Sequence, residues 1–122
     1  MTIELNHTIV HTHDQDASAA FLASILGVEV GGRTGPFVPI SLTNGVTLDY
    51  MHVDGPVTSQ HYAFLVDDTT FDAAFARITA SGITYWADPG HREPGRLNSM
   101  HGGRGCYFLD PDGHNMELLT RA

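Results

Sequence analysis

The segment Tyr107–Leu119 reads "YFLDPDGHNMELL", and it decides how the rest of the chain is interpreted. Two apolar stretches flank an Asp-Pro-Asp-Gly turn, which is typical of a β-hairpin. A carboxylate, Glu117, stands inside the second apolar stretch. Burying a charge is costly unless it is paired or bound to a metal ion. The position of Glu117 therefore indicates a metal ligand, and the alternative is an edge-strand residue in water.

The composition predicts one small acidic domain over residues 1–122. Of the 122 residues, 42% are hydrophobic, which is enough to fill a single core. Fourteen acidic residues outnumber six basic ones and give a net charge of -8. Without a basic stripe, nucleic acid and anionic membranes are poor partners. A small molecule is the expected partner.

Two further features indicate the compartment. Cys106 is the only cysteine, which excludes an internal disulfide and fits a reducing environment. No apolar run approaches the roughly 20 residues that span a bilayer, and the N-terminus lacks a basic region followed by a long apolar segment. We therefore expect a soluble, cytoplasmic protein.

The first half of the chain predicts a strand, a helix and three short strands. Ile3–Val10 alternates in character as a strand does. A helix over Ala17–Leu26 follows, with Asp14 or Asp16 as its cap and Gly27 at its end. The three short strands fit residues 28–32, 37–43 and 46–53.

The second half repeats this order. A strand over residues 61–66 is followed by a helix that Asp68 caps and Gly82 ends. A strand over residues 83–87 comes next, and the hairpin quoted above closes the chain. The agreement in order makes an internal duplication worth testing residue by residue.

Each half carries a histidine on its first strand and a carboxylate four residues past the glycine of a hairpin turn. These residues are His7 and Asp49 in the first half and His61 and Glu117 in the second. In the first half, Asn44-Gly45 predicts a tight turn of the primed kind. Chance is the alternative, but two residue pairs kept in phase with helix ends and turns favour a duplication.

Modules related by a twofold axis bring equivalent residues together near that axis, so these four side chains can meet. Alternation along the strand puts His61 opposite Tyr62 and Phe64, the bulky side chains that should pack under a helix. Two imidazoles and one carboxylate suit Fe(II), Mn(II), Zn(II), Ni(II) or Co(II) and leave open positions for substrate. We therefore expect one divalent metal ion. The alternative for His61 is a hydrogen-bonded core histidine.

Three segments carry a resemblance to a known family. They are "LNHTIV" near the start, "QHYAFLVDD" in the middle and, most specifically, "GGRGCYFLDPDGHNMELL" at the end. The chain resembles the vicinal oxygen chelate superfamily of glyoxalases, fosfomycin-resistance proteins, extradiol dioxygenases and bleomycin-resistance proteins. The resemblance covers nearly the whole chain. It implies an α+β fold of two βαβββ modules, about 1–54 and about 60–122, which form a cupped mixed sheet.

The same resemblance implies a site and a homodimer. It maps metal ligands onto His7, His61 and Glu117, and it places Tyr107 where several members hold a tyrosine that hydrogen-bonds the substrate. In related isomerases a glutamate such as Glu117 leaves the metal to act as a base. Glyoxalase-type members use a fourth ligand, a glutamate, where this chain has the shorter Asp49. Direct binding by Asp49, binding through water and no binding all stay open.

The expected function is that of a metal-dependent enzyme whose small substrate chelates the ion through vicinal oxygens. Four protein ligands suit glyoxalase-like lyase or isomerase chemistry, whereas three suit a chelating substrate or dioxygen, as in a dioxygenase. The alternative is a metal-free small-molecule binding protein of the bleomycin-resistance kind. Such proteins generally lack the His, His, Glu set.

One long loop is the candidate substrate-binding segment. Asp88–Gly103 reads "DPGHREPGRLNSMHGG" and is too long for a simple turn. Long loops in compact domains are often functional. Within it, Arg92 and His101 are the first candidates for substrate contacts, and a merely solvated loop is the alternative.

Overall fold

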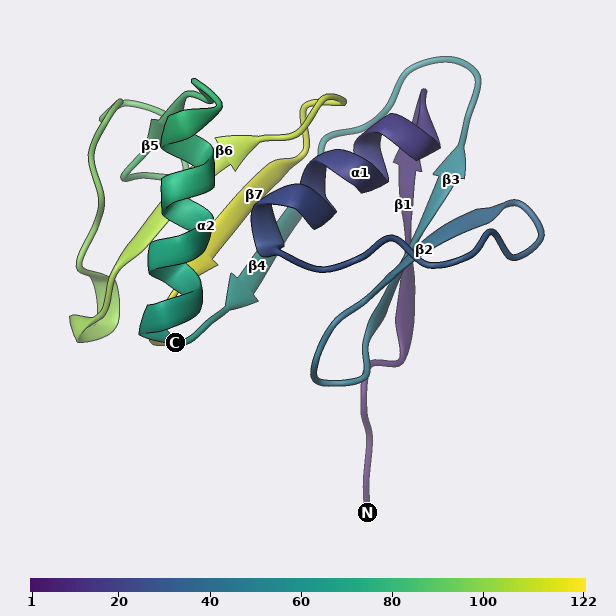
Figure 1. Ribbon diagram of the computed structural model, residues 1–122, viewed down its shortest axis with the longest axis horizontal. Coiled ribbons are helices and arrows are strands. Elements are labelled where there is room, and N and C mark those ends of the chain that lie inside the picture. Colours follow the sequence, from purple (N-terminus) through teal and green to yellow (C-terminus); the bar gives the residue numbers. More distant parts are fainter.

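A computed structural model describes all residues from 1 to 122. Two helices, α1 (Gln15–Leu26) and α2 (Asp68–Ala80), lie against two β-sheets (Figure 1). The strands are β1 (His7–Thr12), β2 (Phe37–Ser41), β3 (Thr47–His52), β4 (His61–Leu65), β5 (Tyr85–Trp86), β6 (Gly105–Leu109) and β7 (Asn115–Leu119). The order β-α-β-β followed by β-α-β-β-β confirms the predicted α+β fold of two modules.

The two sheets have matching strand arrangements. Their orders are β1-β3-β2 and β4-β7-β6-β5. The first strand of each module runs parallel to the last one, with His7 opposite Thr47 in the first sheet and His61 opposite Asn115 in the second. The duplication inferred from the sequence is therefore visible in the strand register. The module boundaries near residues 54 and 60 stay a prediction.

The two hairpin turns also share one hydrogen-bond pattern. The Leu42 N–H donates to the Val46 carbonyl over 2.8 Å, and the Asp110 N–H donates to the His114 carbonyl over 3.0 Å. Each turn thus holds three residues and ends in a glycine with positive φ, 87° and 84° respectively. The primed two-residue turn predicted at Asn44-Gly45 is wrong, because only the glycine of that pair has positive φ.

Both helices begin at an aspartate. The Asp14 carboxylate accepts the N–H of the third residue after it over 3.0 Å, and Gly27 ends α1 with a φ of 74°. In α2 the cap is Asp67 rather than the predicted Asp68. Asp68 is the first helical residue, and its carboxylate instead pairs with Arg104 at 2.9 Å. Neither helix has the length and apolar character that a membrane crossing requires.

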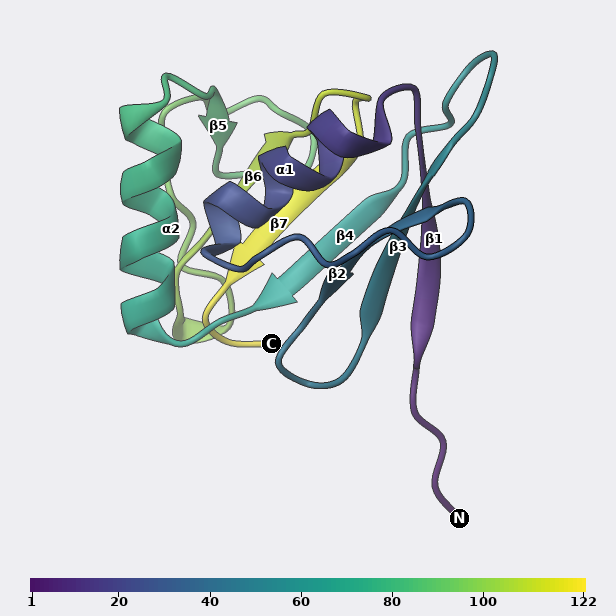
Figure 2. The ribbon, with the colours of Figure 1, turned by 45° about the vertical axis from the view of Figure 1, so that its right-hand side comes forward.

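Three predicted strands differ from the structure. The strand expected over Ile3–Val10 begins only at His7, and the residues before it form an exposed extension (Figures 1 and 2). Residues 28–32 form no strand, since their backbone makes only one hydrogen bond to a strand, from the Gly31 N–H to the Pro39 carbonyl of β2. The strand expected over residues 83–87 shortens to β5. A strand forms only where a neighbouring strand satisfies its backbone groups.

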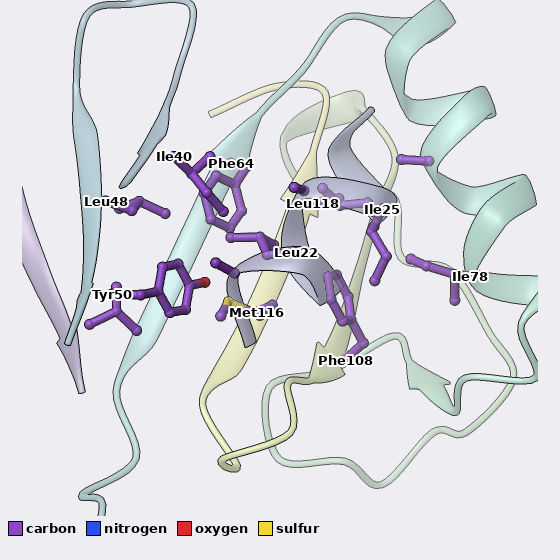
Figure 3. Close-up of a cluster of buried hydrophobic side chains, with 14 of the residues drawn as sticks. Leu22, Ile25, Ile40, Leu48, Tyr50, Phe64, Ile78, Phe108, Met116 and Leu118 are labelled. Carbon is purple, nitrogen blue, oxygen red and sulfur yellow. The ribbon is translucent and has the colours of Figure 1, made fainter. Parts of the chain in front are cut away.

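The core is shared between the modules and fixes which side chains face away from it. Seventeen buried apolar residues form one cluster, in which Leu22 of α1 packs near Met116 and Leu118 of β7 (Figure 3). Side chains alternate along a strand, so Glu117, between two fully buried residues, faces the opposite side. Asp49 on β3 likewise faces away from the core.

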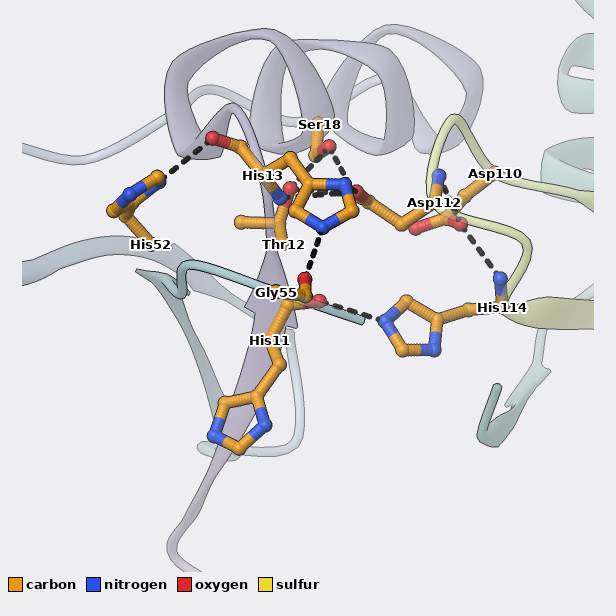
Figure 4. A network of polar contacts seen from close by, with 9 residues as sticks. All are labelled: His11, Thr12, His13, Ser18, His52, Gly55, Asp110, Asp112 and His114. Atoms are coloured by element: carbon orange, nitrogen blue, oxygen red, sulfur yellow. Dashed lines mark hydrogen bonds and ion pairs between the residues drawn. The ribbon is translucent and has the colours of Figure 1, made fainter. Parts of the chain in front are cut away.

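A polar network joins the two modules beside the core. Asp112 in the β6–β7 turn accepts hydrogen bonds from the Ser18 hydroxyl (2.7 Å), the Thr12 hydroxyl (2.5 Å) and the His13 backbone N–H (3.0 Å) (Figure 4). His114 directly follows the same turn, and its buried ring donates to the backbone carbonyl of His11 in β1 over 2.8 Å. This network locks the end of β1 and the start of α1 onto the second module.

Candidate functional site

The face of the second sheet that points away from the core brings three of the predicted site residues together. Tyr107 on β6 is the register partner of Glu117 on β7. His61 on β4 reaches the same point, and its Nε2 atom lies 3.0 Å from Oε1 of Glu117. The Glu117 side chain is only 12% exposed, so its neighbours shield the carboxylate from water. We call His61, Tyr107 and Glu117 the sheet-two cluster.

His61 faces hydrogen-bond acceptors on both sides of its ring. Nδ1 lies 3.0 Å from the Asn115 backbone carbonyl, and Nε2 faces the Glu117 carboxylate. A neutral imidazole has a single N–H. Because the carbonyl can only accept, Nδ1 carries that hydrogen, and the Nε2 lone pair points at a carboxylate oxygen. This arrangement is favourable only with a cation between the two atoms, either a proton or a metal ion.

The spacing of the pair fits a metal ion. Nitrogen and oxygen ligands bind transition metals at about 2.1 Å. Two such ligands at a right angle on one ion therefore lie about 3 Å apart. The 3.0 Å between His61 Nε2 and Glu117 Oε1 is compatible with this separation, and it is equally an ordinary hydrogen-bond distance with a proton between the two atoms. Their donor types, imidazole and carboxylate, are those that the predicted metals prefer.

Tyr107 lies beside His61 in the sheet-two cluster. The two rings stack with centroids 5.9 Å apart and an angle of 28° between their planes. Burial raises the pKa of Tyr107 to about 12, and the negative charge of Glu117 contributes to the rise. The phenol is therefore protonated at neutral pH and serves as a hydrogen-bond donor. Its contact with substrate stays a prediction.

His7 and Asp49 lie on the exposed face of the first sheet. His7 is opposite Thr47 on β3, and Asp49 is opposite Ile9 on β1. Partners in register share a face, so His7 and Asp49 point to the same side. His7 Nδ1 lies 2.8 Å from the side-chain oxygen of Asn6. We call His7 and Asp49 the sheet-one pair.

One chain does not bring the complete ligand set together. No group of three or more His, Cys, Asp or Glu side chains lies close enough to hold a metal ion. His61 and Glu117 meet, whereas the sheet-one pair lies on a different sheet (Figure 2). The roles of His7, His61, Glu117 and Asp49 as ligands stay a prediction.

The two loop residues predicted to contact substrate are both exposed. Arg92 forms no side-chain hydrogen bond and gives only its backbone N–H to the Asp88 carboxylate, at 2.9 Å. His101 lies in a short 3-10 turn, Met100–Gly102, with a φ of 56°. Neither residue contacts the sheet-two cluster through a hydrogen bond. Their contacts with substrate stay a prediction.

The sequence interpretation missed another residue of the same loop. His91 stacks on Trp86 with ring centroids 3.9 Å apart, and its Nε2 atom lies 2.9 Å from the side-chain oxygen of Asn115. The backbone carbonyl of Asn115 in turn accepts from His61. The only sequence signal was the presence of a histidine in a long loop, which did not distinguish His91 from His101.

A comparison with protein families identifies the superfamily of the chain. The family model of the Glyoxalase/Bleomycin resistance protein/Dioxygenase superfamily matches residues 4–118. The chain belongs to this superfamily. The resemblance to the vicinal oxygen chelate superfamily inferred from the sequence is thereby confirmed. Members of the superfamily generally bind a divalent metal ion, and imidazole and carboxylate, the side-chain groups of His61 and Glu117, are donor types that such an ion accepts.

Several superfamily members are similar over the whole chain. The glutathione transferase FosA of Serratia marcescens is 33% identical over 128 residues, which cover 97% of this chain and 81% of the relative. The solved structure of oxidase ChaP-H2 is 59% identical with a TM-score of 0.98, covering 100% of this chain and 96% of that one. Oxidase ChaP-H1 is 56% identical with a TM-score of 0.97, covering 99% and 98%. These relatives are named as enzymes of different reaction types.

Proposed function

We propose that this protein is a metal-dependent enzyme whose small substrate binds the ion through two neighbouring oxygen atoms. The observation that carries the proposal is the 3.0 Å approach of His61 Nε2 to the Glu117 carboxylate. Metal-ligating histidines usually donate their other N–H to a carbonyl or carboxylate, as His61 does to Asn115. When bound, the ion supplies a Lewis acid that stabilises negative charge developing on the substrate oxygens.

Two side chains of the protein would act on the bound substrate. Tyr107, protonated and next to His61, would donate a hydrogen bond to a substrate oxygen. Glu117 would serve first as a ligand, and in isomerase or lyase chemistry it would also accept a substrate proton. An oxidation receives the most support among reaction types, because the solved structures at 59% and 56% identity are named oxidases.

The arginines argue against a phosphonate as the substrate. A doubly charged phosphonate calls for several cations around one pocket. Arg33 instead pairs with Asp16 at 3.0 Å, and Arg104 pairs with two carboxylates of α2 at 2.9 and 2.6 Å. Arg77 donates to a backbone carbonyl of α1 at 3.0 Å. Half of the six basic residues are therefore committed elsewhere.

We also propose that the active unit is a homodimer in which His7 of the partner subunit completes the sheet-two cluster. β1 and β4 each lie at the edge of a sheet and have no strand partner on that side, where the His11 carbonyl of β1 accepts from the His114 ring. Each also exposes an apolar side chain, Ile9 (42% exposed) and Leu65 (64%). Joining the edge of β1 to the edge of β4 in a second subunit would merge the two exposed faces into one cupped surface.

Mixed dimers test whether the metal site is shared between subunits. Homodimers of His7→Ala and of Glu117→Gln should each bind no metal. A dimer with one chain of each kind keeps one intact combination, namely His7 from the Glu117→Gln chain with His61 and Glu117 from the other. We expect elemental analysis of doubly purified mixed dimers, isolated with two tags that lack histidine, to find about one ion per dimer. Metal-free mixed dimers would show that the site is not built this way.

Metal content also separates the enzyme from its alternative, a metal-free binding protein. Protein purified without a polyhistidine tag should contain nearly one ion per chain, and a His7→Ala/His61→Ala double variant should contain none. The reason is that an ion left with a single carboxylate loses both of its imidazole ligands. Wild-type protein that takes up no metal under any loading condition favours small-molecule binding of the bleomycin-resistance kind.

A further inference from the structure

His91 is held in a fixed position by its own loop. Its backbone has a φ of 59°, a conformation that is uncommon for residues other than glycine. The turn around it is closed by the Asp88 carboxylate, which accepts the backbone N–H groups of Arg92 (2.9 Å) and Glu93 (2.8 Å). Hydrogen bonds within the loop therefore hold His91 in an uncommon backbone conformation.

The stack on Trp86 places His91 on the same side of the sheet as the sheet-two cluster. Trp86 is the register partner of Tyr107, and Tyr107 is the register partner of Glu117. Register partners share a face, so the three side chains form one row across the sheet. His91 lies parallel to Trp86, at 10° between ring planes, and also reaches Asn115 on β7. The imidazole therefore lies over the same face of the sheet as Tyr107.

The hydrogen bonds of Asn115 settle which nitrogen of His91 carries the hydrogen. The amide nitrogen of Asn115 can only donate, and it faces the Pro89 carbonyl at 3.4 Å. The amide oxygen therefore faces His91 and accepts from Nε2 at 2.9 Å. In the neutral ring, Nδ1 then carries a lone pair. No group of the chain donates a hydrogen bond to this atom.

We propose that His91 contacts the substrate, with Nδ1 accepting a hydrogen bond from a substrate hydroxyl group. The inference rests on the proposed function, since the substrate is the one that the metal site holds. Tyr107 and His91 are then complementary: the phenol donates to a substrate oxygen, and the imidazole accepts from one. This pair favours a chelating substrate that keeps one protonated hydroxyl group over one that offers only carbonyl or carboxylate oxygens.

Two chelating probes test the proposal on protein loaded with Co(II). Catechol binds metals through vicinal oxygens and can keep one hydroxyl proton, whereas oxalate chelates in the same way but has no hydroxyl group at neutral pH. His91→Phe keeps a ring on Trp86 and removes both nitrogens. We expect it to weaken catechol binding about tenfold, the contribution of one hydrogen bond. Oxalate binding and the affinity for Co(II), measured by calorimetry, should stay within about twofold.

Additional variants separate substrate contact from a structural role. If the phenylalanine variant is unstable, His91→Asn removes Nδ1 as well, and asparagine adopts positive φ more readily than most residues. Adding Asn115→Ala to His91→Phe should cause no further loss, since both changes act on one contact. His52→Phe, at an exposed histidine at the end of β3 to which no role in the site is assigned, is the control and should bind both probes normally.

The outcomes distinguish this inference from the proposed function. Unchanged catechol binding in His91→Phe overturns the contact with substrate. Equal weakening of catechol and oxalate, or a loss of Co(II) affinity, also overturns it, because His91 would then only order the site. Failure of the wild-type protein to bind Co(II) contradicts the proposed function instead, and that result is visible before any probe is added.

Discussion

Replacing Glu117 with glutamine should abolish tight metal binding while leaving the metal-free protein at least as stable as the wild type. Glutamine keeps the shape of the side chain but offers a neutral oxygen in place of a charged ligand. Mutation of a residue that only hydrogen-bonds a metal ligand typically lowers metal affinity 10–100-fold, so mutation of a ligand itself should lower it at least about 100-fold. The carboxylate is only 12% exposed, and removing it relieves the cost of shielding a charge from water.

Thermal unfolding with and without metal measures both parts of this expectation. For the wild type, an ion at a hundredfold excess over its Kd stabilises the folded state by about 2.7 kcal/mol. Glu117→Gln should show no such rise in its unfolding midpoint, and its metal-free midpoint should equal or exceed that of the wild type. Glu29→Gln, at an exposed glutamate, is the matched control and should behave as the wild type. An equal metal-induced rise in Glu117→Gln would exclude this residue as a ligand.

The sequence predicted the second half of the site because the relevant signals are local. Alternation along a strand depends only on neighbouring residues, so the sequence alone was enough to put Glu117 on the face away from the core. The glycine turn that precedes β7 set its register, and His61 begins the strand that pairs beside it. Two local patterns thus place His61 and Glu117 on neighbouring strands, where the structure brings their side chains within 3.0 Å, and their role as ligands stays a prediction.

The missed features depend on contacts between distant segments. Ile3 alternates as well as any strand residue, but no strand lies beside it, and the backbone there stays unpaired. His91 and His101 belong to the same loop and both have positive φ. Only the stack on Trp86 and the bond to Asn115 separate them, and both contacts arise when the loop folds back over the sheet.

Replacing Asp112 with alanine should destabilise the protein by about 3 kcal/mol. Hydrogen bonds to a charged group contribute more to the free energy of unfolding than neutral ones, and the buried donors that now bond to Asp112 would be left without an acceptor. The Asp112 side chain is 5% exposed and accepts from Thr12, Ser18 and His13. We expect the midpoint of thermal unfolding to fall by roughly 10 °C. Asp72→Ala removes an exposed carboxylate paired with Arg104 and should cost less than about 1 kcal/mol.

The cost of Asp112→Ala should also depend on pH in one direction. Burial alone would raise the pKa of Asp112, but the hydrogen bonds from Thr12, His13 and Ser18 outweigh it and hold the pKa below the ordinary 3.8. A carboxyl group whose pKa is lower in the folded state stabilises that state above pH 3.8, and this contribution disappears as the pH falls through the folded pKa. Burial raises the pKa of the neighbouring Asp110, which has the opposite sign, and the charge of Asp112 adds to that rise, so Asp112→Ala also reduces the rise at Asp110. Below pH 3.8, where Asp112 itself becomes protonated, the difference in unfolding free energy between wild type and Asp112→Ala, measured by urea titration, should shrink. A difference that stays constant down to pH 2 would mean that the charge of Asp112 does not stabilise the polar network between the two modules.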